Sequence, residues 1–209
     1  MSSTEVDDIK ILLVDDQPAT RLGIQDLLRS VEGVEIVGEA VSSEEAVRLN
    51  EKLRPDLVIL DPSLEGEMSE AEICRELKSS QSPPRVLIYS GRNSREDVAV
   101  ASLAGADSYL YKGLAAERLA EVVERTCSGQ KVWLLGPVES DQENDFRSKI
   151  DGAGLTPKER EILALLMKRH TNQEIAEEFH LSANTVKTHV KNILKELHFS
   201  SRSELFKVD

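Results

Sequence analysis

Five polar side chains follow or end short apolar runs, a placement that could gather them around one phosphoryl group. They are Asp15, Asp16, Asp61, Ser90 and Lys112. Crowded carboxylates repel one another, and a divalent cation such as Mg²⁺, which prefers oxygen ligands, relieves that repulsion. One carboxylate could then attack a phosphoryl group while the cation, the hydroxyl and the ammonium neutralise its oxygens. These residue types assign the attack to Asp61.

The pattern of apolar residues predicts the elements that position these side chains. Up to about residue 128, aliphatic runs alternate with amphipathic stretches, as in a doubly wound, flavodoxin-like parallel sheet with helices on both faces. Five strands are expected, at residues 11–14, 34–37, 57–60, 85–88 and 108–110. Ligands of such sheets bind outside the carboxyl ends of the strands, where the five side chains fall. An Asp-Asp pair alone is more often a helix cap, so the prediction depends on all five occurring in order.

Residues 10–128 resemble a receiver domain of the bacterial response-regulator family. The similarity is carried by three segments, residues 12–18 (LLVDDQP), 56–61 (DLVILD) and 105–112 (GADSYLYK). The resemblance implies that Asp61 is the phospho-acceptor and that Mg²⁺ assists the transfer. The implied metal ligands are Asp15, Asp16, Asp61 and the backbone carbonyl of Ser63.

The same resemblance assigns roles to three further residues. Ser90 would bind the phosphoryl group, Lys112 would pair with it, and Tyr109 would be the switch aromatic that swings inward. The alternative for Tyr109 is a half-buried strand tyrosine with no switching role.

The loop after Asp61 departs from the family pattern. Pro62 fixes its own φ angle and disfavours the helical region for Asp61, while Glu65 and Glu67 add negative charge beside an anionic site. Phosphorylation is therefore expected to be slow. The alternative function is an atypical receiver that works through dimerisation or partner binding, independently of phosphorylation.

The C-terminal part is all helical and resembles a LuxR-type helix-turn-helix over residues 155–206, which places the chain in the NarL/FixJ type of regulator. Three capping boxes, at residues 156–159, 171–174 and 201–204, and a cap at Ser182 predict four short helices. The helix after Ser182 has an apolar stripe and an opposite face of lysine, threonine and asparagine residues. On a lone helix such a face is more often simply solvated, but it also suits the major groove of DNA.

The predicted contacts with double-stranded DNA fall into three groups. Lys187, Thr188 and Lys191 are assigned to base edges or nearby phosphates, and Asn184 and Lys195 to the DNA backbone. Phosphate contacts are added by Arg160, Thr171 and Asn172. Arg169 and His198 stand where the family has helix-ending glycines. Each is therefore expected to adopt a left-handed backbone conformation, which costs about 1 kcal/mol of stability at a non-glycine residue.

Charge supports two domains with different tasks. The chain of 209 residues has a net charge of −12, but residues 154–209 carry 9 basic and 8 acidic residues and are therefore at +1. The preceding 153 residues hold the remaining −13. We expect an N-terminal tail at 1–9, a receiver at 10–128, a linker at 129–153 and the DNA-binding domain at 154–209.

The remaining expectations concern partners and compartment. The phosphoryl group would come from a cognate histidine kinase or a small phosphodonor, and the active form would be a homodimer. No apolar run is long enough to span a membrane and no signal peptide is evident, so a cytoplasmic protein without membrane contact is expected. The helical domain supplies no catalytic group for an external substrate, so an enzyme is not expected. Cys74 and Cys127 lie outside any metal or disulfide spacing.

Overall fold

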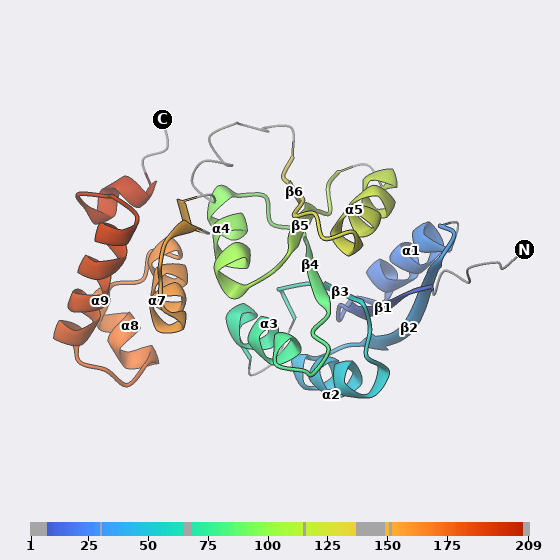
Figure 1. The fold of residues 1–209 in the computed structure, drawn as a ribbon, viewed down its shortest axis with the longest axis horizontal. Helices are drawn as coiled ribbons and strands as arrows, with labels where there is room; N and C mark the ends of the chain where they lie inside the picture. Colours follow the sequence, from blue (N-terminus) through green and yellow to red (C-terminus); the bar gives the residue numbers. More distant parts are fainter. Residues whose placement is uncertain are drawn as a thin grey trace, which may run out of the picture. The chain divides into compact units, whose positions relative to one another are not determined.

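The computed structural model describes residues 8–29, 31–64, 68–114, 116–136, 149–150 and 152–206. The chain divides into two compact units (Figure 1), residues 1–93 with 105–137, and residues 94–104 with 138–209. Part of the predicted linker, residues 137–148, lies outside the described residues, as do residues 1–7 of the predicted tail. No helix in the described ranges is both long and apolar enough to cross a membrane.

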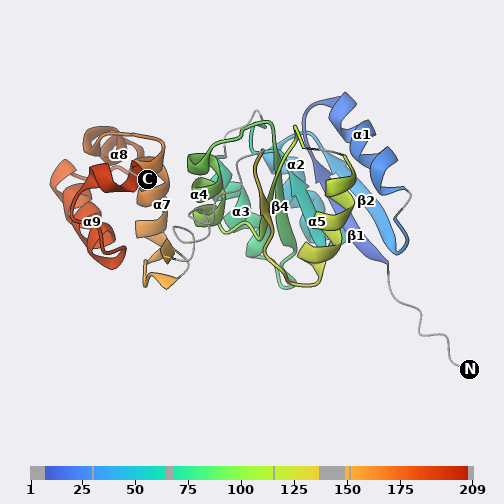
Figure 2. The same ribbon diagram turned by 90° about the horizontal axis from the view of Figure 1, so that it is seen from above.

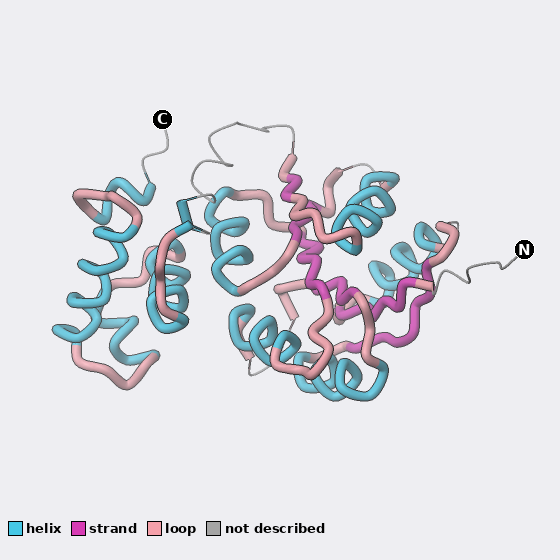
Figure 3. Tube along the Cα trace, in the orientation of Figure 1, coloured by secondary structure: helices cyan, strands magenta, loops and turns pink. Residues whose placement is uncertain are grey.

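The first unit contains a fully parallel sheet with the order β2-β1-β3-β4-β5-β6 (magenta in Figure 3). Its strands are β1 Ile9–Val14, β2 Val34–Ala40, β3 Leu57–Leu60, β4 Arg85–Ser90, β5 Ser108–Tyr111 and β6 Trp133–Leu134. Every residue of β3 and the last four of β1 are buried, which explains their continuous apolar sequence. The α/β fold is confirmed.

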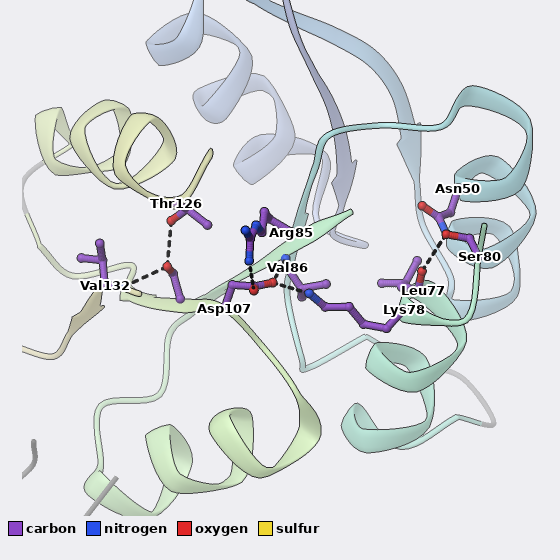
Figure 4. A network of polar contacts seen from close by, with 10 residues as sticks. Asn50, Leu77, Lys78, Ser80, Arg85, Val86, Asp107, Thr126 and Val132 are labelled. Carbon is purple, nitrogen blue, oxygen red and sulfur yellow. Dashed lines mark hydrogen bonds and ion pairs between the residues drawn. The ribbon is translucent and has the colours of Figure 1, made fainter. Parts of the chain in front are cut away.

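The predicted number of five strands is corrected to six in the described part of the chain, because β6 lies within the segment expected to be linker. This strand has only two residues, too few to show a periodicity. It is held by side chains as well as by pairing: the Ser108 hydroxyl accepts hydrogen bonds from the Val132 amide (3.1 Å) and the Thr126 hydroxyl (2.7 Å; Figure 4). The pairing places Trp133 opposite Tyr109 of β5.

Helices connect the strands. They are α1 Pro18–Leu28, α2 Ser43–Leu53, α3 Glu70–Lys78, α4 Arg95–Ala104 and α5 Glu117–Cys127. In the first unit, α1 and α5 lie on one face of the sheet and α2 and α3 on the other (Figure 1 and Figure 2). Pro18 begins α1, and α3 begins with a capping box in which Ser69 accepts from the Glu72 amide. Cys74 of α3 is buried and unpaired, and burial raises the pKa of its thiol.

An ion-pair network joins the amino end of β4 to its surroundings (Figure 4). The carboxylate of Asp107 accepts from Lys78 Nζ, from Arg85 Nη1 at 3.1 Å and from the Val86 amide at 2.8 Å. Burial alone would raise the pKa of Asp107, but these hydrogen bonds outweigh it and hold the pKa below its usual value.

Asp107 should therefore contribute to acid sensitivity. Because its folded pKa is depressed, its stabilisation is complete above the unfolded pKa of about 3.9 and is lost as pH falls through the folded pKa. We expect the free energy of unfolding of Asp107→Asn to fall less than that of the wild type between pH 6 and pH 3, measured by urea denaturation. Asp26→Asn, which removes an exposed ion pair with Arg29, is the control. Its free energy of unfolding should change with pH as steeply as that of the wild type. Parallel slopes for wild type and Asp107→Asn would contradict the assignment.

The second unit contains the C-terminal helices α7 Pro157–Met167, α8 Asn172–Glu178, α9 Ala183–Glu196 and the 3-10 helix η1 Arg202–Phe206. The capping boxes predicted at Thr156 and Thr171 are present, and Ser182 caps α9 by accepting from the Thr185 amide. Their apolar faces share a core that includes Ile162, Leu166, Ile175, Val186 and Ile193. The predicted fourth helix is a 3-10 helix, in which Glu204 accepts from the Ser200 amide.

Arg169 (φ 66°) and His198 (φ 60°) have left-handed backbones, as predicted, and His180 (φ 53°) does too. Because glycine adopts this conformation without penalty, His198→Gly should raise the free energy of unfolding by about 1 kcal/mol, measured by denaturant titration. The control is Lys168→Gly, at a residue with φ of −74°, which should lower stability instead. A loss of stability in His198→Gly would show that its side chain contributes more than the backbone costs.

Candidate functional site

Two buried carboxylates and one ammonium group meet at the carboxyl ends of β1, β3 and β5. Parallel pairing of β1 with β3 places Asp15 beside Asp61, whose side chains are 3% and 4% exposed. Lys112 Nζ lies 2.7 Å from Asp15 Oδ2 and 2.6 Å from Asp61 Oδ2. Three residues separated by up to 97 positions are thus brought together as predicted.

The other carboxylate oxygens are held by backbone amides. Asp15 Oδ1 accepts from the amide of Gln17, and Asp61 Oδ1 accepts from the amide of Ser63, both at 2.8 Å. Burial alone would lower the pKa of Lys112, but its hydrogen bonds to the two carboxylates outweigh this and raise the pKa. Lys112 therefore remains a cation at neutral pH, able to stabilise negative charge on Asp61 or on a group attached to it.

The fit of this site to Mg²⁺ rests on its donor chemistry. Among the described residues no group of three or more His, Cys, Asp or Glu side chains is arranged to hold a metal. Asp16, which follows Asp15 in the chain, is partly exposed. Carboxylate oxygens are the ligands that Mg²⁺ prefers, and the two buried carboxylates against one ammonium leave negative charge that a divalent cation would offset. Asp15 and Asp61 therefore have the donor chemistry that fits this ion.

Ser90 and Tyr109 are both fully buried and converge on the loop after β4. Ser90 Oγ accepts from the amide of Arg92 at 3.1 Å, and the Tyr109 hydroxyl donates to the Arg92 carbonyl at 2.8 Å. Tyr109 is therefore directed inward in this structure, which differs from the half-buried alternative. Its role as a switch residue stays a prediction.

Sequence reasoning did not identify Arg92 or its partner Glu70. Arg92 Nη2 lies 2.9 Å from Glu70 Oε2, and the two residues are 22 positions apart. No local pattern identified the pair, since a single arginine in a polar loop is usually solvated. The altered loop itself is only partly described: Pro62 lies in a turn, whereas Glu65 and Glu67 lie outside the described residues.

In the second unit, helix α9 presents a cationic groove. It is lined by Lys187, Thr188, Val190, Lys191, Leu194, Lys195, Phe199 and Ser200. The three lysines and Thr188 are exposed, while Val186, Val190 and Ile193 of the same helix are buried. Thr188 Oγ1 donates to the Asn184 carbonyl at 3.1 Å, so its lone pairs remain as acceptors, which suits the amino group of adenine or cytosine.

The other predicted DNA contacts do not line this groove. Asn184 is exposed one turn before Thr188, Thr171 and Asn172 begin α8, and Arg160 lies in α7. Thr171 caps α8 by accepting from the Glu174 amide. The structure therefore groups four of the eight predicted residues in one groove and leaves four outside it.

Comparison with known proteins gives the same two parts. The response regulator receiver domain family matches residues 11–124, and the luxR family of bacterial regulatory proteins matches residues 153–208. The nitrate/nitrite response regulator NarL of Escherichia coli K12 is 36% identical over 93% of this chain and 91% of its own length. Response regulator VraR of Staphylococcus aureus is 35% identical over 94% of this chain and 93% of its own length.

Solved structures agree in fold. RcsB from Salmonella typhimurium matches with a TM-score of 0.57 at 21% identity, over 94% of this chain and 95% of RcsB. The receiver domain of NarL from Mycobacterium tuberculosis matches with a TM-score of 0.56 at 27% identity, over 59% of this chain and 99% of that domain. Because family models match both parts and relatives align along nearly the whole length, the chain belongs to the NarL/FixJ-type response regulators, DNA-binding regulators of the two-component kind.

Proposed function

We propose that phosphorylation of Asp61, assisted by Mg²⁺, controls the binding of this protein to double-stranded DNA. The observation that carries the proposal is the placement of Asp61 Oδ2 at 2.6 Å from Lys112 Nζ, in a buried acidic site at the ends of parallel strands. The proposed organisation is a receiver at 10–128, a linker at 129–153 and a DNA-binding domain at 154–209. The phosphoryl group comes from a cognate histidine kinase or a small phosphodonor, in the cytoplasm and without membrane contact.

In the proposed transfer, a carboxylate oxygen of Asp61 attacks phosphorus, and the bond from phosphorus to the donor's leaving atom breaks with its electron pair. That atom is the imidazole nitrogen of a phosphohistidine or the acetate oxygen of acetyl phosphate. Lys112 is held between Asp15 and Asp61, so its ammonium is in place to neutralise the phosphoryl oxygens. Ser90 donates its hydroxyl proton to one of them. Asp15, Asp16, Asp61 and the Ser63 carbonyl would hold Mg²⁺, which supplies charge neutralisation for the transferred group. The reaction modifies the protein itself, so no external substrate is turned over.

For DNA binding, the groove on α9 supplies the contact surface. Lys187, Thr188 and Lys191 face base edges or nearby phosphates, and Asn184 and Lys195 contact the backbone. Arg160, Thr171 and Asn172 add phosphate contacts from the other helices. The active form is a homodimer, as expected for a regulator that reads two half-sites.

The experiment combines intact mass and DNA binding on the full chain. Incubation with acetyl phosphate and Mg²⁺ should add the mass of one phosphoryl group, and the modified protein should bind a selected DNA site more tightly, measured by fluorescence anisotropy. The second candidate, regulation by dimerisation or partner binding alone, is favoured by Pro62 in the turn after Asp61. Tight, specific DNA binding without any mass increase would support that candidate.

A further inference from the structure

Three elements of the receiver are joined through a single residue, Arg92, in the loop after β4. Its amide donates to Ser90 Oγ (3.1 Å) and its carbonyl accepts from the Tyr109 hydroxyl (2.8 Å). Its guanidinium Nη2 contacts Glu70 Oε2 (2.9 Å) at the start of α3. The backbone of Arg92 is thus bonded to the site, while its side chain is bonded to a helix outside it.

Glu70 is a suitable anchor because it is rigidly placed and deeply buried. It is the first residue of α3, within the capping box formed by Ser69 and Glu72. The side chain of Glu70 is 3% exposed, against 37% for that of Arg92. A carboxylate with so little access to water depends on its cationic partner, and its position in the first helical turn adds favourable interaction with the helix dipole.

The hydrogen bond from the Arg92 amide determines how the Ser90 hydroxyl can be used. A hydroxyl has one proton and two lone pairs, and here one lone pair is occupied by the Arg92 amide. Because the amide approaches the oxygen, the hydroxyl proton must point away from it and remains available to a phosphoryl oxygen. Displacement of Arg92 would leave the Ser90 hydroxyl free to rotate and would remove the carbonyl that accepts from the Tyr109 hydroxyl.

We propose that Arg92 is a positioning residue for phosphoryl transfer to Asp61, and that the ion pair with Glu70 fixes it there. The proposal rests on the proposed function, since Ser90 acts on the phosphoryl group that is transferred to Asp61. The ion pair of Arg118 with Glu121 on the surface of α5 is not expected to have this role. Its side chains are 53% and 41% exposed.

The test compares Glu70→Ala with the matched control Glu121→Ala, which removes a glutamate from the exposed pair. Phosphorylation by acetyl phosphate and Mg²⁺ is followed by intact mass over a range of donor concentrations. Glu70→Ala should lower the limiting rate by about three- to tenfold, the value of one hydrogen bond, without raising the donor concentration at half-maximal rate. Glu121→Ala should keep the wild-type rate.

Two further variants separate positioning from a general loss of structure. Glu70→Gln, which keeps an acceptor oxygen, should recover part of the rate lost in Glu70→Ala. The double variant Glu70→Ala with Arg92→Ala should lose no more of the phosphorylation rate than the more strongly affected single variant, because both changes break the same interaction. Additive losses, or a wild-type rate in a folded Glu70→Ala variant, would overturn the proposal while leaving phosphorylation of Asp61 intact.

A measurement on unphosphorylated protein keeps the two proposals distinct. Hydrogen exchange of the Arg92 amide, followed by NMR, should accelerate in Glu70→Ala and stay unchanged in Glu121→Ala. If the wild type acquires no phosphoryl group, the proposed function fails, and this exchange still decides whether Glu70 fixes the loop. Unchanged exchange in Glu70→Ala would overturn the anchoring role, whatever the outcome of phosphorylation.

Discussion

Replacement of Asp61 by asparagine is expected to abolish the mass increase that acetyl phosphate and Mg²⁺ produce in the wild type. Asn cannot supply the anionic oxygen that attacks phosphorus. Asp61 is the buried, Lys112-paired carboxylate that follows β3, and β3 pairs directly with β4, which ends at Ser90. The full rate of transfer should therefore be lost, the largest effect that any single substitution in this protein should have on phosphorylation.

The control for this substitution lies at the other end of the same strand. Asp56 precedes β3 and accepts from the Lys10 amide at 2.8 Å, away from the acidic site. Asp56→Asn makes the same chemical change and should be labelled as fully as the wild type. Full labelling of Asp61→Asn, with the modified residue located by peptide mapping, would show that the phosphoryl group is carried elsewhere.

Loss of Lys191 is expected to weaken DNA binding by about 1–3 kcal/mol if its ammonium contacts a base. Lys191 is exposed and lies in the groove on α9 between Lys187 and Lys195. A contact only to phosphate would instead weaken all sequences alike and reduce the slope of log K against log salt by about 1. Anisotropy titrations of Lys191→Ala against a selected site and a random duplex, at several salt concentrations, distinguish these cases.

Lys168→Ala provides the matched control for charge. Lys168 is exposed at the end of α7 and does not line the groove, so its removal changes the net charge equally without removing a predicted contact. It should leave specific binding near the wild-type value. Equal affinities of Lys191→Ala and wild type for both duplexes would exclude Lys191 from the interface.

Sequence reasoning predicted the acidic site because topology alone brings strand ends together. Once buried runs were recognised as parallel strands, Asp15, Asp61 and Lys112 had to share an edge, however far apart they lie in the chain. The helix caps at Thr156 and Thr171 could also be predicted, because a capping box is a pattern of four consecutive residues.

The features that sequence reasoning missed depend on single contacts. Strand β6 has two residues and is held partly by the Ser108 hydroxyl, which no periodicity reveals. The pairing of Glu70 with Arg92 depends on where the start of α3 meets the loop after β4, and charge alone offers many other partners. Left-handed residues could be predicted only where glycine was expected, so Arg169 and His198 were identified and His180 was not.

The pairing of β5 with β6 gives the protein an intrinsic fluorescent reporter. Trp133 is the single tryptophan of the chain, and it lies directly opposite Tyr109 in the parallel register. Indole emission responds to the polarity and mobility of its surroundings, so a rearrangement of Tyr109 should change the emission of Trp133. Stopped-flow fluorescence could then follow the receiver in real time on unlabelled protein, with no dye attached to the sheet edge.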